Sequence, residues 1–220
     1  MKGNIVVVIP AHNEAKNIAE VIFHAKKYCK NIIVVDDGSK DGTAQVAKKM
    51  GVEVIIKHKI NQGKGAALRT GADRAVAEGA KILVFIDADR QHEPHEIPIF
   101  LEKLKDADIV FGSRRRTPHM PFVYRFGNFG LTLISKILFG VGIHDTQSGY
   151  RAMTAETYKK IRWKSNDYSA ETEMIANVGK HKLKYAETFI RTIYHDTRKG
   201  TTVWHGLKIA ADMMKWKVRK

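Results

Sequence analysis

Short apolar runs alternate with amphipathic segments through the first half of the chain, and this alternation restricts the possible folds more than any other feature. Apolar runs rich in valine and isoleucine predict buried strands, here over Asn4–Pro10, Asn31–Asp37, Val52–Lys57, Ile82–Asp87 and Ala107–Arg114. The segments between them have helical spacing, at Asn13–Lys27, Thr43–Met50, Ala66–Glu78 and Pro94–Lys105. Strands alternating with helices predict an α/β fold with a mostly parallel central sheet flanked by helices.

Residues of the kinds that bind ligands follow the first, second, fourth and fifth of these strands. The sets are Pro10, Asn13 and Glu14; Asp36 and Asp37; Asp87, Asp89 and Gln91; and Ser113 and Arg114. One polar strand end is unremarkable, but the carboxyl ends of parallel strands meet at one edge, where open α/β sheets bind ligands. We therefore expect these sets to line a single cleft.

The strand Ile82–Asp87 runs into the most informative of these sets, Asp87-Ala88-Asp89. Two carboxylates at a strand end supply hard oxygen ligands, which suit Mg²⁺ or Mn²⁺ carrying a substrate phosphate. Gln91 and His92 follow within reach. The alternative is that Asp87 or Asp89 only caps the helix that is entered through Pro94.

A glycine-rich segment, Asn61-Gln62-Gly63-Lys64-Gly65, precedes the helix at Ala66–Glu78. It lacks the P-loop pattern, and Leu68 stands where the dinucleotide fingerprint has its third glycine, so nucleotide hydrolysis and hydride transfer are disfavoured. A nucleotidylyltransferase is disfavoured because its glycine-rich loop is missing after the first strand. The glycines can still bring backbone amides and Lys64 close to a ligand, although a flexible turn with a solvated lysine has the same pattern.

The 220 residues suit one domain, which we place over residues 1–220. The single cysteine, Cys29, excludes an internal disulfide and fits a reducing cytoplasm. Residues 1–10 do not have the pattern of a signal peptide. No apolar stretch approaches the roughly 18 residues that a membrane-spanning helix requires.

The formal net charge of +15 calls for an explanation. Nucleic acid, an anionic membrane surface and phosphorylated substrates are compatible with it, as is a solvated lysine-rich surface without a partner. Acidic residues cluster at the strand ends, and no basic stripe interleaved with aromatic residues is present. We therefore expect no nucleic-acid partner.

Four motifs occur together in the order of a known family: Pro10-x-x-Asn13-Glu14, Asp36-Asp37-Gly38-Ser39-x-Asp41-Gly42-Thr43, Asn61-x-Gly63-Lys64-Gly65 and Asp87-Ala88-Asp89-x-Gln91-His92-x-Pro94. The chain resembles the inverting family 2 glycosyltransferases of GT-A, Rossmann-like fold, in the branch of dolichyl and other polyprenyl phosphate mannose and glucose synthases. Two further motifs extend the resemblance over residues 4–200: Gly112-Ser113-Arg114 and Asp145-x-x-Ser148-Gly149-Tyr150-Arg151.

The resemblance implies an enzyme that moves mannose or glucose from GDP-mannose or UDP-glucose to a polyprenyl phosphate. Residues 1–114 would bind the nucleotide sugar and residues 115–220 the acceptor. Asp87 and Asp89 would hold Mg²⁺ or Mn²⁺ with help from Gln91, and Asp89 and Arg114 would act at the reacting bond. Asp37 would accept hydrogen bonds from the base. The donor-binding set would be Pro10, Ala11, Asn13, Glu14, Val35, Asp37, Lys64, Asp87, Ala88 and Arg114.

The acceptor determines which further residues are needed. A phosphate is already ionised near neutral pH and needs cations more than a base; the candidates are Arg114, Arg125, Arg151, Arg198 and Lys199. A hydroxyl of a glycan, protein or small molecule would instead need a carboxylate base. Asp145 is then the best candidate catalytic base, unless it only caps its loop. Glu171 and Glu173 open a predicted helix, where the helix dipole favours acids, and the resemblance places an acid of this region near the sugar.

Two apolar segments of the second half suggest contact with a membrane surface. Phe122–Gly142 is expected to lie in the membrane interface or, alternatively, to be a core helix. A basic C-terminal helix fits an anionic membrane or packing on the protein body; its predicted apolar stripe is Trp204, Leu207, Ala211, Met214 and Val218. We expect a cytoplasmic protein associated peripherally with the inner face of the membrane.

Overall fold

The computed structural model describes residues 4–114, 122–191, 193 and 203–218, with side chains described outside 122–129, 203–207 and 218. Its centre is a seven-stranded sheet in the order β3-β2-β1-β4-β6-β5-β7. The strands are β1 (Ile5–Ala11), β2 (Ile32–Asp36), β3 (Val54–Lys57), β4 (Ile82–Phe85), β5 (Ile109–Arg114), β6 (Arg151–Thr154) and β7 (Tyr185–Ile190).

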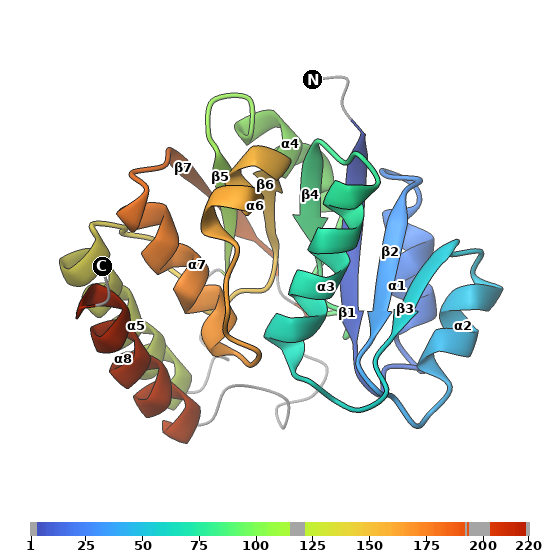
Figure 1. The fold of residues 1–220 in the computed structure, drawn as a ribbon, viewed down its shortest axis with the longest axis horizontal. Helices are drawn as coiled ribbons and strands as arrows, with labels where there is room; N and C mark the ends of the chain where they lie inside the picture. Colours follow the sequence, from blue (N-terminus) through green and yellow to red (C-terminus); the bar gives the residue numbers. More distant parts are fainter. Residues whose placement is uncertain (1–3, 115–121, 192, 194–202, 219–220) are drawn as a thin grey trace.

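Neighbouring strands run parallel except at β6, which is antiparallel to β4 and β5. The register pairs Ala11 at the end of β1 with Asp36 at the end of β2, and Val8 of β1 with Phe85 at the end of β4. The carboxyl ends of these three strands therefore meet at one edge, which is the lower edge of the sheet in Figure 1. The expected α/β fold with a mostly parallel sheet is confirmed.

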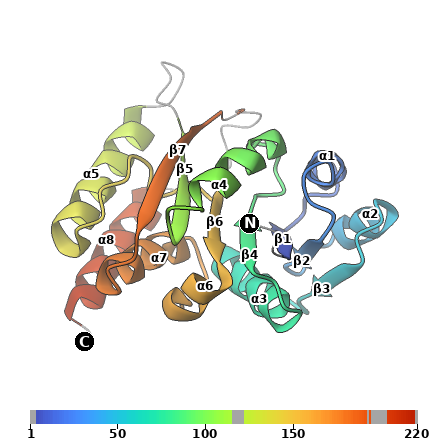
Figure 2. The same ribbon diagram turned by 90° about the horizontal axis from the view of Figure 1, so that it is seen from above.

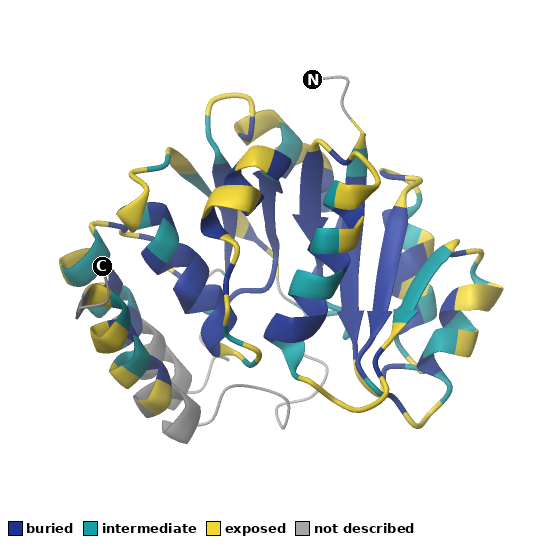
Figure 3. Ribbon diagram, viewed as in Figure 1, coloured by how far each residue is buried: buried dark blue, intermediate teal, exposed yellow. Residues whose placement is uncertain are grey.

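Helices cover both faces of the sheet (Figure 2). α3 (Lys64–Ala77), α6 (Ala155–Ile161) and α7 (Ser169–Lys180) pack on one face. α1 (Ile18–Ala25), α2 (Thr43–Lys49) and α4 (Ile97–Lys103), with the short 3₁₀ helix η1 (Pro94–Glu96), lie on the other. Val6 and Val8 point to the first face and Val7 and Ile9 to the second, because side chains alternate along a strand. Both faces are covered, which explains the uninterrupted apolar runs and the buried strands of Figure 3.

The five predicted strands are present, with ends within two residues of the expected positions. The predicted start of the first helix is wrong, because α1 begins at Ile18 and Asn13 does not cap it. Asn13 lies in the preceding turn with φ +55°, and its Oδ1 accepts a hydrogen bond from the Lys40 backbone N–H at 2.9 Å. Asn13 therefore joins the loops after β1 and β2.

α5 (Phe122–Phe139) and α8 (Val203–Val218) lie side by side at one end of the molecule (Figures 1 and 2). Leu131, Ile209 and Met213 form a small apolar cluster between them. The predicted stripe on the C-terminal helix is wrong at its described positions, because Ala211 and Met214 are exposed. Ile209 and Met213, four residues apart on one helix face, make the contact instead. The side chains of Trp204, Leu207 and Val218 lie outside the described part of the structure.

α5 packs on the protein body through part of its surface, while its expected place in the membrane interface stays a prediction. Leu131 is buried against α8, whereas Leu133 and Ile137 are 46% and 70% exposed. Among the residues that the structure describes, no helix has the length and apolarity needed to span a bilayer.

Close packing of α3 on the sheet generates a test of the fold. A Cβ atom at Gly71 would lie 2.4 Å from Val8 Cγ1 and 3.0 Å from Val35 Cγ2. We expect Gly71→Ala to lower the free energy of unfolding by about 1–3 kcal/mol in urea, because the core must shift. Gly130→Ala in α5 is the control, since a Cβ there meets no atom of the described residues within 4 Å and alanine favours a helix. A Gly71→Ala protein as stable as wild type would contradict this packing.

Candidate functional site

Hydrogen bonds between loops bring the predicted strand-end residues together at the carboxyl edge of the sheet. The Asp37 N–H donates to the Ala11 carbonyl at 2.8 Å, and the Asn13 N–H donates to Ser39 Oγ at 2.9 Å. The Glu14 N–H donates to Thr43 Oγ1 at 2.9 Å. The loops after β1 and β2 are thus one connected wall of the site.

A charged cluster lies beside this wall, where α3, the end of β4 and α7 meet. Lys64 Nζ is 2.8 Å from Asp87 Oδ1, 2.9 Å from Asp87 Oδ2 and 3.1 Å from Glu171 Oε1. Burial disfavours the charged form of Lys64, but the two carboxylates outweigh it and raise the pKa of the ammonium. Burial also opposes ionisation of Asp87, yet Lys64 lowers the pKa of that carboxyl. Lys64 and Asp87 therefore form a strong ion pair.

Among the described residues, no lysine or arginine side chain forms an ion pair with Asp89. Burial and the adjacent Asp87 carboxylate raise the pKa of Asp89 to about 6, although its Oδ1 accepts a hydrogen bond from the Gln91 N–H at 3.0 Å. His92 is buried with Nδ1 3.8 Å from Asp87 Oδ2, and burial lowers the pKa of His92 to about 4. A neutral imidazole adds no positive charge, so His92 does not help to neutralise the aspartate pair.

These residues fit a divalent cation that is shared with a phosphate ligand. Asp87 and Asp89 offer hard oxygen atoms, and Glu171 Oε2 is buried without a hydrogen-bond partner among the described residues. Within that part of the chain no group of three acidic, histidine or cysteine side chains forms a ligand set. Mg²⁺ often takes one or two carboxylates and completes its shell with water and phosphate oxygens. Neither Asp87 nor Asp89 caps the helix that is entered through Pro94, because the residue at the N-cap position of η1 is Glu93.

Asp37 uses its carboxylate to hold the glycine-rich loop. Oδ1 accepts hydrogen bonds from His58 Nδ1 at 2.7 Å and from the Gln62 N–H at 2.8 Å, and Oδ2 accepts from the Gly63 N–H at 2.8 Å. His58 Nε2 lies 3.0 Å from Thr70 Oγ1 in α3. In this structure Asp37 thus positions the loop that carries Lys64, whereas the sequence predicted a contact with the base.

Arg114 and Asp145 form a paired unit. Arg114 Nε is 2.5 Å from Asp145 Oδ2 and its Nη2 is 3.1 Å from Oδ1. Burial opposes ionisation of Asp145, but Arg114 outweighs it and lowers the pKa of the carboxyl. The predicted role of Asp145 as a catalytic base is therefore not supported, because a carboxylate held by arginine is a poor proton acceptor. Asp145 Oδ1 also accepts from the Gln147 N–H at 3.1 Å, which is the loop-capping alternative.

The prediction that Arg151 holds an acceptor phosphate is wrong. Arg151 is only 2% exposed, and its guanidinium donates to the carbonyl oxygens of Ser148 and Glu171. It also lies over the ring of Phe111, 5.5 Å from the centroid. Arg151 therefore supports the loop before β6 from inside the core.

The predicted donor-binding residues fall into two groups. The side chains of Ala11, Val35 and Ala88 are buried in the core, so any donor contact at these positions would come from the backbone, and their donor-binding role stays a prediction. Pro10 is buried in β1 next to the site, while Glu14 accepts a hydrogen bond from Asn17 Nδ2 at 2.6 Å. For Pro10, Asn13 and Glu14 the donor-binding role stays a prediction. Arg198, Lys199 and the side chain of Arg125 lie outside the described residues.

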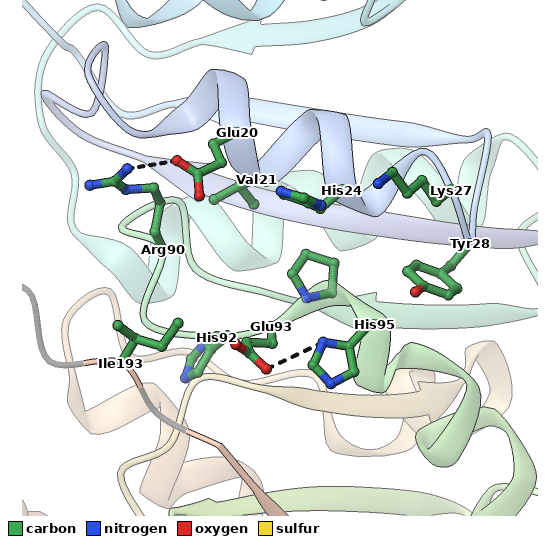
Figure 4. Close-up of a pocket in the computed structure, with 11 residues that line it drawn as sticks. Glu20, Val21, His24, Lys27, Tyr28, Arg90, His92, Glu93, His95 and Ile193 are labelled. Carbon is green, nitrogen blue, oxygen red and sulfur yellow. Dashed lines mark hydrogen bonds and ion pairs between the residues drawn. The ribbon is translucent and has the colours of Figure 1, made fainter.

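A small cavity of about 170 Å³ borders the site between α1 and the segment after β4 (Figure 4). Arg90, in the left-handed region at φ +63°, reaches across it to Glu20 of α1 with Nη1 2.6 Å from Oε2. None of Asp37, Asp87 and Asp89 lines the cavity, so it is not the predicted donor site. The Arg90–Glu20 pair instead anchors the loop that carries Asp89.

Sequence reasoning missed His58 and undervalued Glu171. His58 follows β3 directly, and its place just before a glycine-rich loop was the available signal. Glu171 looked like an ordinary acid at a helix start, and only the tertiary contact with Lys64 distinguishes it from Glu173. Glu173 caps the neighbouring loop, accepting from the N–H groups of Lys164 and Ser165 at 2.9 and 2.8 Å.

Comparison with known proteins identifies the family. Residues 6–162 match the profile of glycosyl transferase family 2. The chain belongs to this family. It is a glycosyltransferase with the GT-A fold, and the resemblance seen in the sequence motifs is confirmed.

Two relatives and one solved structure illustrate the similarity. The UDP-N-acetylglucosamine–dolichyl-phosphate N-acetylglucosaminyltransferase of Methanococcus voltae is 34% identical, over 98% of this chain and 97% of the relative. The polyprenol monophosphomannose synthase of Mycolicibacterium smegmatis is 35% identical, over 70% of this chain and 63% of the relative. The glucosyl-3-phosphoglycerate synthase of Mycobacterium tuberculosis, solved with Mg²⁺ and UDP, has the same fold at 20% identity and a TM-score of 0.78, covering 98% and 79% of the two chains.

The role of Asp37 in holding the glycine-rich loop is testable. We expect Asp37→Ala to speed amide hydrogen exchange at Gln62 and Gly63 and to lower the free energy of unfolding by about 1–3 kcal/mol, because buried charge-assisted hydrogen bonds are lost. Asn61→Ala, which removes an exposed acceptor of the Gly63 N–H, is the control and should have a smaller effect. Unchanged exchange in Asp37→Ala would contradict this role.

Proposed function

We propose that this glycosyltransferase is metal-dependent and inverting, and that it moves a hexose from a nucleotide sugar to dolichyl or another polyprenyl phosphate. The carrying observation is the pair of Asp87 and Asp89 at the carboxyl edge, with Lys64 beside Asp87 and the pKa of Asp89 raised by burial and by the neighbouring carboxylate. GDP-mannose and UDP-glucose are the proposed donors. The dolichyl-phosphate and polyprenol activities named for the two relatives support the acceptor class.

The chain's own residues would hold and neutralise the leaving diphosphate. Asp87 and Asp89 would bind Mg²⁺ or Mn²⁺, with Gln91 beside them. The bound ion supplies Lewis-acid neutralisation of the departing nucleotide. Lys64 would add a charge-assisted hydrogen bond to the diphosphate, and Arg114 would do so from an orientation set by Asp145. The Asp37 contacts would keep the glycine-rich loop in place while the donor binds.

The state of Asp145 favours a phosphate acceptor over a hydroxyl. A hydroxyl needs a base to take its proton, but the pKa of Asp145 is lowered by Arg114. A phosphate brings its own negative charge and needs only orientation and cations. Arg198, Lys199 and Arg125 remain proposed acceptor-phosphate ligands. Transfer to a hydroxyl is the alternative, and Glu171, whose Oε2 has no hydrogen-bond partner among the described residues, is then the acid to replace by mutation.

Peripheral binding to the cytoplasmic face of the membrane is part of the proposal. Leu133, Ile137 and Met214 are exposed apolar residues on α5 and α8. Exposed lysines accompany them: Lys136, Lys208, Lys215 and Lys217. Apolar side chains that insert into an interface and cations that meet anionic headgroups act together in such binding.

Sugar transfer can be measured directly. We expect labelled lipid when dolichyl phosphate in detergent is mixed with Mn²⁺ and one of GDP-mannose, UDP-glucose or UDP-N-acetylglucosamine. EDTA should abolish the product, and Asp89→Asn should lower the rate by about a hundredfold or more because a metal ligand is lost. Asp106→Asn, at an exposed turn after α4, is the control.

The pattern of products separates the alternatives. Metal-dependent hydrolysis of one donor without labelled lipid would reject the phosphate acceptor and favour a hydroxyl. Activity that persists in EDTA and in Asp89→Asn would reject the metal site. No reaction with any donor would reject the proposed donor class.

Membrane binding has its own test. We expect the protein to sediment with phosphatidylserine-containing vesicles at low salt, and Ile137→Asp to lower the partition coefficient by about tenfold, since burial of one large apolar side chain is lost. Ile99→Asp, on α4 at 46% exposure, is the control. Equal sedimentation of both variants would reject α5 as the docking face.

A further inference from the structure

The Lys64 ammonium occupies the position on the Asp87 carboxylate where a divalent metal cation would bind. Its ammonium engages both carboxylate oxygens of Asp87, at 2.8 and 2.9 Å, and also lies 3.1 Å from Glu171. The side chains of Lys64 and Asp87 are each only 19% exposed, so water screens these charges weakly. The Lys64 ammonium thus contacts the carboxylates of Asp87 and Glu171 directly, with Asp89 two residues away from Asp87, while the Arg151 guanidinium acts on Asp87 and Glu171 from inside the core.

The backbone around Lys64 is fixed, but the side chain is not. Asp37 holds the N–H groups of Gln62 and Gly63, and Trp163 Nε1 donates to the Gly65 carbonyl at 2.8 Å. A Cβ at Gly65 would lie 2.5 Å from the Ser165 carbonyl oxygen, so the loop cannot shift toward that wall. The lysine stem has four rotatable bonds. Movement of the ammonium away from Asp87 therefore requires only a change of rotamer.

We propose that Lys64 is an internal counter-ion, which must leave Asp87 before a divalent cation binds there and which then pairs with the donor diphosphate. The inference rests on the proposed function and adds an exchange of cations to it. A divalent cation and an ammonium on one carboxylate repel each other strongly where screening is weak. Arg151 cannot take over the ammonium's place, because carbonyl oxygens hold it in the core.

This arrangement makes metal and nucleotide binding cooperative. Without nucleotide, Lys64 competes with the metal for Asp87, so the metal binds weakly. The diphosphate offers Lys64 another partner and thereby frees Asp87. Because linkage is reciprocal, metal should tighten nucleotide binding by the same factor.

The experiment measures free Mn²⁺ by electron paramagnetic resonance during titration of the protein, with and without UDP or GDP. Lys64→Met should bind Mn²⁺ about tenfold or more tightly than wild type without nucleotide, and nucleotide should then improve Mn²⁺ affinity less than it does in wild type. Lys64→Arg keeps the charge and should remain close to wild type. Lys40→Met, which removes an exposed lysine from the loop after β2, controls for net charge.

The outcomes are distinct. Mn²⁺ affinity in Lys64→Met that equals or falls below that of wild type would overturn the proposal, as would the same increase in Lys40→Met. If the unfolding midpoint of Lys64→Met is far below that of wild type, Lys64→Gln replaces it. A wild-type protein that binds neither nucleotide would reject the proposed function, whereas the nucleotide-free Mn²⁺ titration would still decide the role of Lys64.

Discussion

The ion pair between Lys64 and Asp87 is the interaction on which the site depends. It joins the first residue of α3 to the end of β4, and Glu171 extends it to α7. The main chain is packed so tightly here that a Cβ at Gly149 would lie 2.4 Å from Asp87 Oδ2. The carboxylate is therefore confined on two sides, by an ammonium and by backbone.

The surrounding charges are arranged as fixed pairs that leave one site under-neutralised. Asp37 is satisfied by its loop, Asp145 by Arg114, and Arg151 by carbonyl oxygens. Burial and a like charge raise the pKa of Asp89 to about 6. Such a contrast is typical of a site whose missing charge comes from a ligand. Under the proposed function, that ligand would be the metal and the nucleotide sugar together.

The sequence predicted the structure best where a residue type has a single physical explanation at its position. Continuous apolar runs located the strands, and the acids after Ile82–Phe85 located the site, because strand ends converge in a parallel sheet. It worked less well for Arg151 and Asp145. An arginine or aspartate looks the same in a sequence whether it meets a substrate or a buried carbonyl, and only burial and partners distinguish the two.

The sequence by itself determined the α/β class, the family through its motifs, and the edge of the sheet where the candidate site lies, because periodicity and local motifs depend on neighbouring residues alone. Only the tertiary structure decided which charges pair. Lys64 and Glu171 are far apart in the chain but form an ion pair. The face of α8 that packs on α5 carries Ile209 and Met213, which are not in the predicted stripe. Pairing and helix rotation depend on how packed elements meet, and such contacts leave no local pattern in a single sequence.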